Sequence, residues 1–207
     1  MDDLRLPPPV RLLWSRGDAP ELGEQLLREA IGPTDEPAPG RLVHQCVTCA
    51  STEHGIPSWT DDGHPVPFVS LSRAGDITVV AVSDVGPVGV DVEADGTAEF
   101  VGFDAVALHP AETVDQGGRT VIWVRKEALL KATGHGLTVE PSRIRLSAPD
   151  AAPELIEWGG PGGAPSAWLY DVVDVPGHVV AVSVLGPQRP ALAVRRAPGR
   201  PPRPATP

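Results

Sequence analysis

The sequence has few of the features of secreted or membrane proteins. Its only cysteines are Cys46 and Cys49, too few for a disulfide framework. The first residues, MDDLRLPPPV, are acidic and then proline-rich, whereas a signal peptide begins with a basic segment and continues with an apolar one. No run of about 18 apolar residues occurs, so we expect no transmembrane helix. These absences together favour a cytoplasmic protein.

Basic charge is also scarce. The 17 lysines and arginines are outnumbered by 27 aspartates and glutamates, and the net charge is −10. Proteins that bind nucleic acids or anionic membranes carry a basic surface, so we expect neither as a general partner. A single phosphate-rich ligand remains compatible with this charge, because a few well-placed cations suffice to bind it.

Three common catalytic motifs are missing. The sequence contains no G-x-S-x-G, no Walker A motif and no dinucleotide-binding fingerprint. Their absence removes the commonest competing classes of enzyme.

The chain is long enough for one large domain or two small ones, and 41% of its residues are hydrophobic. Apolar periodicity predicts a helix over residues 19–32. Residues 110–134 are helical in character: PAETV (110–114) starts one segment, and RTVIWVRKEALLKATG (119–134) follows, with Gly134 as its C-terminal cap. Strands are predicted over residues 67–72, 76–83, 87–93, 142–147, 167–173 and 178–186. Residues 33–67 are predicted to be mostly loop, and the Pro/Arg-rich residues 187–207 to be a disordered tail.

A short segment occurs twice. VVAVSDVGP (79–87) and VVAVSVLGP (179–187) are identical at seven of nine positions. Strand composition alone makes some agreement expected, but the repeat hints at two similar halves. We predict an α+β fold, a pseudo-dimer of two similar α/β halves (residues 1–100 and 101–186) with the ligand cleft between them.

The segment VGVDVE (88–93) has the composition of a buried strand but contains two carboxylates. Side chains alternate along a strand, so Asp91 and Glu93 point to one face while Val90 and Val92 point to the other. Two anions about 7 Å apart repel each other unless positive charge lies between them. The alternative is a strand that simply runs out into solvent.

The segment WVRKEALLK (123–131) supplies positive charge and a third carboxylate. Trp123, Glu127 and Lys131 share one helical face, with Lys126 on the neighbouring ridge. If this face meets the strand, three carboxylates converge, which suits Mg²⁺ completed by substrate phosphates, and the lysines face those phosphates. The alternative is an ordinary exposed pair of Glu127 and Lys131 on one helix.

The two segments together resemble the signature of the 4′-phosphopantetheinyl transferase superfamily, in the longer, monomeric type that activates surfactin synthetase. The family pattern is G-x-D-x-E, then W-x-x-K-E-(A/S)-x-x-K and G-x-G-L. LHPAE (108–112), SLSRAGD (70–76) and CVTCASTEHGIP (46–57) resemble further family segments, so the resemblance covers roughly residues 40–186. Every element of the pattern is present: Gly89, Asp91, Glu93, Trp123, Lys126, Glu127, Ala128, Lys131, Gly134, Gly136 and Leu137.

The resemblance implies an enzyme of the holo-[acyl-carrier-protein] synthase type. Such enzymes transfer the phosphopantetheine arm of coenzyme A to a serine of an acyl or peptidyl carrier protein, in fatty acid, polyketide or nonribosomal peptide biosynthesis, and release adenosine 3′,5′-bisphosphate. By position, Asp91, Glu93 and Glu127 would hold Mg²⁺, and Asp91, Glu127 and Lys131 would be catalytic. Glu127 would be the general base for the carrier serine, and Lys131 would stabilise the departing phosphate. Coenzyme A would be bound by Ser72, Arg73, Lys126, Lys131 and Arg28.

The sequence departs from the family at two positions. Arg73 stands where the family usually has a histidine, and a guanidinium is a competent phosphate ligand. Ile56 stands where the family has a lysine or arginine, so we expect weaker coenzyme A binding than in a typical member. The alternative is a weak or inactive homologue that binds a carrier protein or a nucleotide without transfer.

A zinc site is a further alternative for the cysteine-containing segment. The spacing of His44, Cys46, Cys49 and His54 allows one, but a single Cys-x-x-Cys with nearby histidines is weak support. We favour small buried cysteines beside a loop histidine.

Overall fold

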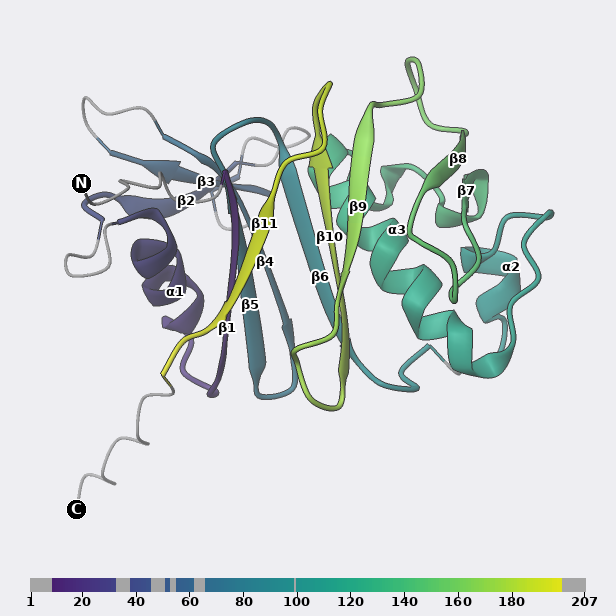
Figure 1. Ribbon diagram of the computed structural model, residues 1–207, viewed down its shortest axis with the longest axis horizontal. Coiled ribbons are helices and arrows are strands. Elements are labelled where there is room, and N and C mark those ends of the chain that lie inside the picture. The colour runs from purple at the N-terminus through teal and green to yellow at the C-terminus, as the bar shows by residue number, and fades with distance from the viewer. Residues whose placement is uncertain are drawn as a thin grey trace, which may run out of the picture.

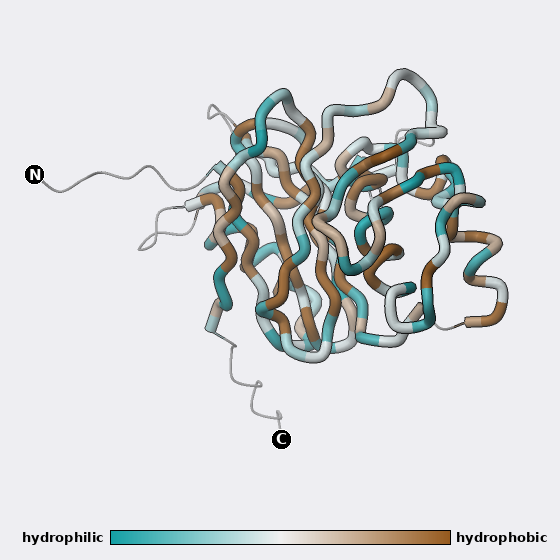
Figure 2. Tube along the Cα trace, turned by 45° about the vertical axis from the view of Figure 1, so that its right-hand side comes forward, coloured by the Kyte–Doolittle hydropathy of each residue, from teal (hydrophilic) through white to brown (hydrophobic). Residues whose placement is uncertain are grey.

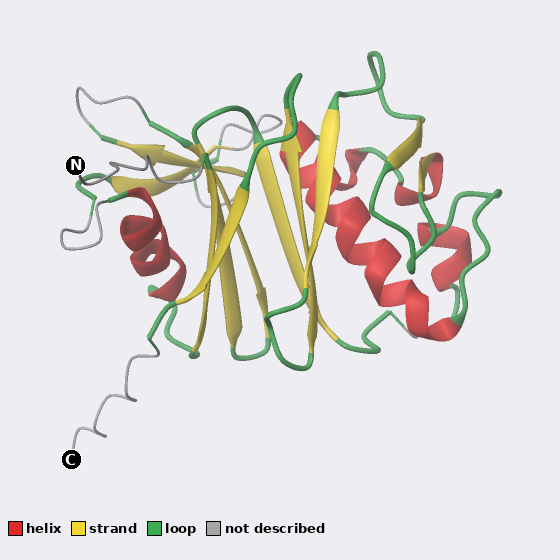
Figure 3. Ribbon diagram, viewed as in Figure 1, coloured by secondary structure: helices red, strands yellow, loops and turns green. Residues whose placement is uncertain are grey.

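A computed structural model of the chain describes residues 9–32, 38–45, 51–52, 55–61, 66–98 and 100–198. Two β-sheets occupy the middle of the molecule, with helices towards both ends (Figures 1 and 3). The first sheet contains, in spatial order, β11 (Leu192–Arg196), β1 (Val10–Arg16), β5 (Ile77–Ser83) and β4 (Phe68–Ala74). The second contains β6 (Val88–Ala94), β10 (His178–Leu185) and β9 (Ala167–Val172).

Helices cover the outer faces of both sheets. Helix α1 (Leu22–Ile31) packs on the first sheet, and helix α3 (Arg119–Thr133) packs on the second, beside the short α2 (Phe103–Ala107). No described helix is long and apolar enough to cross a membrane. Smaller elements are the hairpins β2 (Arg41–Gln45) with β3 (Ile56–Thr60) and β7 (Ile144–Leu146) with β8 (Leu155–Trp158), and the 3₁₀ helices η1 (Gln116–Gly118), η2 (Gly136–Thr138) and η3 (Pro141–Arg143).

The main core lies between the two sheets. Every residue of β5 is buried, because one face of this strand meets α1 and the other meets the second sheet. Strand β10 is the middle strand of the second sheet and is buried in the same way, between the first sheet and α3. The two VVAVS segments belong to these middle strands, and burial on both faces explains their apolar composition. Figure 2 shows hydrophobic residues running along these strands.

Most of the predicted elements are confirmed. The structure is a mixed α/β fold, and the helix predicted over 19–32 is α1. The second predicted helix ends as expected, since Gly134 takes the left-handed conformation (φ 73°) that a β-carbon disfavours. The six predicted strands are β4, β5, β6, β7, β9 and β10, with bounds that agree within two residues.

The helical segment predicted to start with PAETV (110–114) is wrong, whereas the segment predicted to follow it from Arg119 is confirmed as α3. The Glu112 carboxylate accepts the backbone N–H of His109 at 2.8 Å. The Asp115 carboxylate accepts the backbone N–H of Gly118 at 2.9 Å and so begins η1. These side-chain hydrogen bonds stabilise turns in place of an α-helix.

Two segments predicted to lack regular structure contain strands. The predicted loop over 33–67 contains the hairpin β2–β3, which the buried Trp59 ties to Pro39 through its indole N–H. The predicted disordered tail over 187–207 contains β11, which pairs in parallel with β1, while residues 199–207 lie outside the described residues. Strand β1 itself has no counterpart in the sequence-based prediction. It directly follows three prolines in the sequence, and it lies between β11 and β5 in the first sheet.

Helix α3 and strand β6 touch through their backbones at Gly89. A β-carbon at this position would lie 2.0 Å from the carbonyl oxygen of Ala128 and 2.5 Å from the amide nitrogen of Ala132. Both distances are far below van der Waals contact, so only glycine allows the helix to lie at this height above the strand. The side chains that follow Gly89 on β6 therefore meet the side chains of α3 directly.

We predict that Gly89→Ala lowers the free energy of unfolding by about 3 kcal/mol or more, because the clash is with backbone atoms that cannot rotate away. The matched control is Gly163→Ala, since a β-carbon there meets nothing within 4 Å. Urea unfolding of both variants measures the difference. Equal stability of the two variants would show that α3 can be lifted from β6 at little cost.

Candidate active site between β4, β6 and α3

Strand β6 turns two carboxylates towards helix α3. Val90 and Val92 belong to the core between the sheets, so Asp91 and Glu93 lie on the opposite face, as strand alternation predicts. Asp91 is in register with Ala181 of β10, which packs against α3. Asp91 is almost fully buried beneath this helix, with 6% of its side chain exposed.

The positive charge opposite Asp91 is the ammonium of Lys131. Its Nζ donates to Oδ1 of Asp91 at 2.7 Å, to Oγ of Ser72 at 3.1 Å and to the carbonyl of Val90 at 3.1 Å. The Ser72 hydroxyl in turn donates to the same oxygen of Asp91 at 2.8 Å. Ser72 comes from β4, so both sheets contribute to this cluster. Lys131 therefore pairs across elements instead of forming the ordinary pair on its own helix that was the alternative.

The other two predicted carboxylates are held close enough to influence each other. Burial raises the pKa of Glu127, the negative charge of Asp91 raises it further, and Lys131 opposes the change. Burial likewise raises the pKa of Glu93, again with Asp91 adding to the effect. Lys131 and a hydrogen bond from the Trp123 indole lower the pKa of Glu93 in part. The three predicted carboxylates therefore lie close enough together to repel one another.

Two carboxylate oxygens of this cluster are buried without a hydrogen-bond partner among the described residues. They are Oδ2 of Asp91 and Oε1 of Glu127. Buried carboxylate oxygens are normally satisfied, so each is an acceptor available to a ligand. In the part of the chain that the structure describes, no three His, Cys, Asp or Glu side chains are arranged to hold a metal ion. The predicted ligand set of Asp91, Glu93 and Glu127 stays a prediction.

Lys126 does not lie with this cluster, and its predicted role in binding phosphate stays a prediction. Its side chain is fully buried, and its Nζ donates to Oε2 of Glu112 at 2.6 Å and to the carbonyl of Ala107 at 2.7 Å. Burial lowers the pKa of Lys126, while Glu112 favours the charged form. The other oxygen of Glu112 accepts the backbone N–H of Leu146. Lys126 therefore ties α3 to α2 and β7, on a side of the helix away from Asp91.

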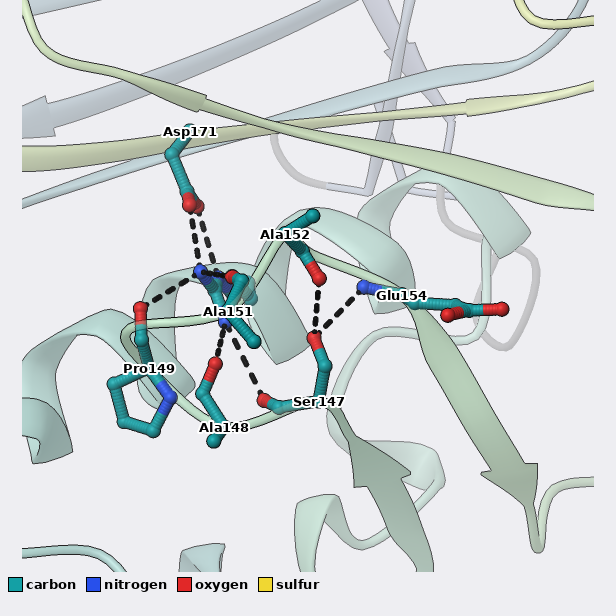
Figure 4. Close-up of polar contacts among 8 residues, drawn as sticks. Ser147, Ala148, Pro149, Ala151, Ala152, Glu154 and Asp171 are labelled. Carbon is teal, nitrogen blue, oxygen red and sulfur yellow. Dashed lines mark hydrogen bonds and ion pairs between the residues drawn. The ribbon is translucent and has the colours of Figure 1, made fainter.

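The sequence reasoning missed Arg125, which anchors the middle of α3. This guanidinium is fully buried and binds Asp171 of β9 with Nε at 2.8 Å and one terminal nitrogen at 2.6 Å. Its two terminal nitrogens also donate to the carbonyls of Ser147, Ala148, Pro149 and Ala151, with Nη2 shared between Asp171 and two of them (Figure 4). The signal in the sequence is that Arg125 has no acidic residue three or four positions away on its helix, so its partner must come from elsewhere.

The residues predicted to bind coenzyme A are only partly brought together. Ser72 joins the Asp91 cluster, whereas Arg73 alternates to the other face of β4 and donates to Thr78 and to the carbonyl of Ala19. Arg28 lies on α1, where it pairs with Glu24 and stacks over Trp59. Neither arginine is among the contacts of Asp91 and Lys131, so their roles stay predictions.

Ile56, the second departure from the family pattern, lies against the end of α3. Its Cδ1 is 3.2 Å from the position that a β-carbon on Gly134 would take. The hairpin β2–β3 therefore reaches from the first sheet to the C-terminus of the helix that carries Glu127 and Lys131. Cys46, Cys49 and His54, the core of the zinc alternative, lie outside the described residues.

A cavity of about 600 Å³ lies apart from the cluster, within the second half of the chain. Its walls come from α2, η3 and β8 and the segments beside them. None of the residues that line it is a predicted site residue. The predicted cleft between the two halves stays a prediction.

Residues 87–183 match the model of the 4′-phosphopantetheinyl transferase superfamily. The match covers slightly less than half of the chain, from the start of β6 into β10, and it includes every member of the cluster except Ser72. No curated protein matches the chain. The second sheet with α3 is therefore similar to a superfamily of transferases of the phosphopantetheine group.

The position of Lys126 gives a direct test of its role. We predict that Lys126→Met lowers the free energy of unfolding by about 3–5 kcal/mol, because it leaves the buried Glu112 carboxylate without its cation. The control is Arg119→Met on the same helix, whose partner Asp104 is largely exposed, and which we expect to change stability by less than about 1 kcal/mol. Urea unfolding distinguishes the two, and a Lys126→Met variant as stable as Arg119→Met would contradict the structural role.

Proposed function

We propose that the chain is a Mg²⁺-dependent 4′-phosphopantetheinyl transferase that modifies a serine of an acyl or peptidyl carrier protein. The observation that carries this proposal is the match of residues 87–183 to the superfamily together with the convergence of Asp91, Glu127 and Lys131 within that segment. The donor would be coenzyme A, and adenosine 3′,5′-bisphosphate would leave.

We further propose the longer, monomeric type, in which two similar halves form one chain. The strand orders support this proposal, since β1-β5-β4 in the first sheet corresponds to β6-β10-β9 in the second. In each set the first strand of the half lies beside the last, and a VVAVS segment occupies the middle position. The boundary between the halves would then fall between Ser83 and Val88, where β5 turns into β6, and not at residue 100.

The residues present fit a hard divalent cation. Such a cation prefers carboxylate oxygens, and the buried, unpartnered oxygens of Asp91 and Glu127 are acceptors of this kind. Asp91, Glu93 and Glu127 would hold it, and when bound it would supply positive charge against the pyrophosphate of coenzyme A.

Glu127 has the properties of the base that the reaction requires. The serine oxygen forms a bond to the phosphorus that carries the pantetheine arm, the bond from this phosphorus to the bridging oxygen breaks, and the serine proton must go to a base. Glu127 is the carboxylate that α3 contributes to the cluster, and burial and Asp91 raise its pKa in the absence of a cation.

Lys131 and Ser72 have complementary positions in the same site. Lys131 is partly exposed, with 30% of its side chain accessible, so its ammonium can face the charge that develops on the departing phosphate. Ser72 holds Asp91 from the other sheet and fixes the orientation of that carboxylate. Because these groups come from β4, β6 and α3, the site depends on the packing of the two sheets.

We predict that incubation with an apo carrier protein, coenzyme A and Mg²⁺ adds the mass of one phosphopantetheine arm to the carrier. Asp91→Asn and Glu127→Gln should each slow the mass gain by about 10²-fold or more, because the reaction loses a charge or a base. Intact-protein mass spectrometry follows the reaction directly.

The matched control for this assay is Glu140→Gln, which removes one exposed carboxylate away from the cluster and should leave the rate unchanged. Measurable coenzyme A binding without mass gain on any of several carriers would contradict the proposal. That result would support the inactive homologue instead.

A further inference from the structure

Lys131 uses its full donor capacity in the structure. An ammonium group has three N–H donors, and Lys131 directs them at three acceptors: Oδ1 of Asp91, Oγ of Ser72 and the carbonyl of Val90. A group committed in this way has no donor left for a phosphate. To serve the proposed reaction, Lys131 must give up at least one of these contacts.

The charges around Lys131 are unbalanced. Asp91, Glu93 and Glu127 act on one another, and Lys131 is the cation that opposes this repulsion at both glutamates. Lys131 binds one oxygen of Asp91, while the second oxygen of Asp91 and one oxygen of Glu127 have no partner among the described residues. The cluster therefore places three carboxyl groups beside one lysine ammonium.

We propose that Lys131 is the resident counterion of Asp91 and that a divalent cation competes with it for this carboxylate, so that cation binding releases the Lys131 amine towards the substrate phosphate. This inference rests on the proposed function for the identity of the cation and of the phosphate. The inference goes beyond the proposed function because it gives Lys131 two alternative partners, Asp91 and the substrate phosphate.

The geometry favours such an exchange. Lys131 is partly exposed at the end of a flexible side chain, whereas Asp91 is fixed beneath the helix. The hydroxyl of Ser72 and the carbonyl of Val90 also hold the amine when it is at Asp91. By contrast, Lys126 is fully buried with Glu112 and has no comparable freedom.

The exchange has a consequence for ligand binding. A cation that displaces Lys131 loses part of its binding energy to the broken ion pair, unless an anion receives the released amine. The cation and a pyrophosphate group should therefore each strengthen the binding of the other. At low concentration, the cation alone or the pyrophosphate alone would bind weakly.

The first test measures Mn²⁺ binding by electron paramagnetic resonance in the wild-type protein, Lys131→Met and Arg119→Met, all without coenzyme A. Lys131→Met should bind Mn²⁺ about tenfold more tightly than wild type, because the competing ion pair is gone. Arg119→Met removes one positive charge from the same helix at similar exposure and should bind as wild type does.

The outcomes separate this inference from the proposed function. Equal Mn²⁺ affinity in wild type and Lys131→Met contradicts the proposal that the cation competes with Lys131 for Asp91, but it leaves the proposed metal site standing. Absence of Mn²⁺ binding in all three proteins overturns the metal site, and with it the metal-dependent part of the proposed function. An equal gain in Lys131→Met and Arg119→Met also overturns the inference, since it would reflect overall charge.

A second test needs no substitution. The sequence contains only two lysines, Lys126 and Lys131, so acetylation by an amine-reactive ester followed by peptide mass spectrometry reports each one separately. Mn²⁺ should increase the labelling rate of Lys131 relative to the buried Lys126, and inorganic pyrophosphate added with Mn²⁺ should lower it again. A ratio that Mn²⁺ leaves unchanged overturns the inference even if Lys131→Met fails to fold.

Discussion

The site depends on the direct backbone contact between α3 and β6. Gly89 allows the carbonyl of Ala128 to lie where any β-carbon would clash, and this contact sets the height of the helix above the sheet. At this height Lys131 reaches Asp91 with a 2.7 Å hydrogen bond, and Glu127 is buried enough for its pKa to rise. In the sequence pattern G-x-D-x-E, the glycine is thus necessary to the geometry of the cluster that the carboxylates form.

Two buried basic side chains tie helix α3 to its neighbours. Arg125 binds Asp171 and the backbone of the loop after β7, and Lys126 is buried against Glu112. Lys131 is partly exposed, beside Asp91 at the junction of the two sheets. Two buried cations therefore hold the helix in place, while the third is accessible beside Asp91.

The sequence predicted the proximity of Asp91 and Lys131 better than it predicted the contacts that hold α3 in place. Asp91 and Lys131 could be placed together because strand and helix periodicity, with the family pattern, define their faces. The sequence could not identify Glu112 as the buried partner of Lys126. Glu112 lies in a turn whose sequence resembles the start of a helix, and only the tertiary fold brings it to Lys126. Strand β11 was missed for a similar reason, since a short segment between prolines becomes a strand only where β1 offers an open edge.

The most direct test of the central proposal, that Asp91 and Glu127 hold a divalent cation beneath α3 at the junction of β4 and β6, is a crystal structure with Mn²⁺ and coenzyme A measured at the manganese absorption edge. The account predicts one anomalous peak in contact with Oδ2 of Asp91 and Oε1 of Glu127, with the amine of Lys131 moved off Asp91. A peak elsewhere, or bound coenzyme A with no peak at these oxygens and Lys131 still on Asp91, would contradict it.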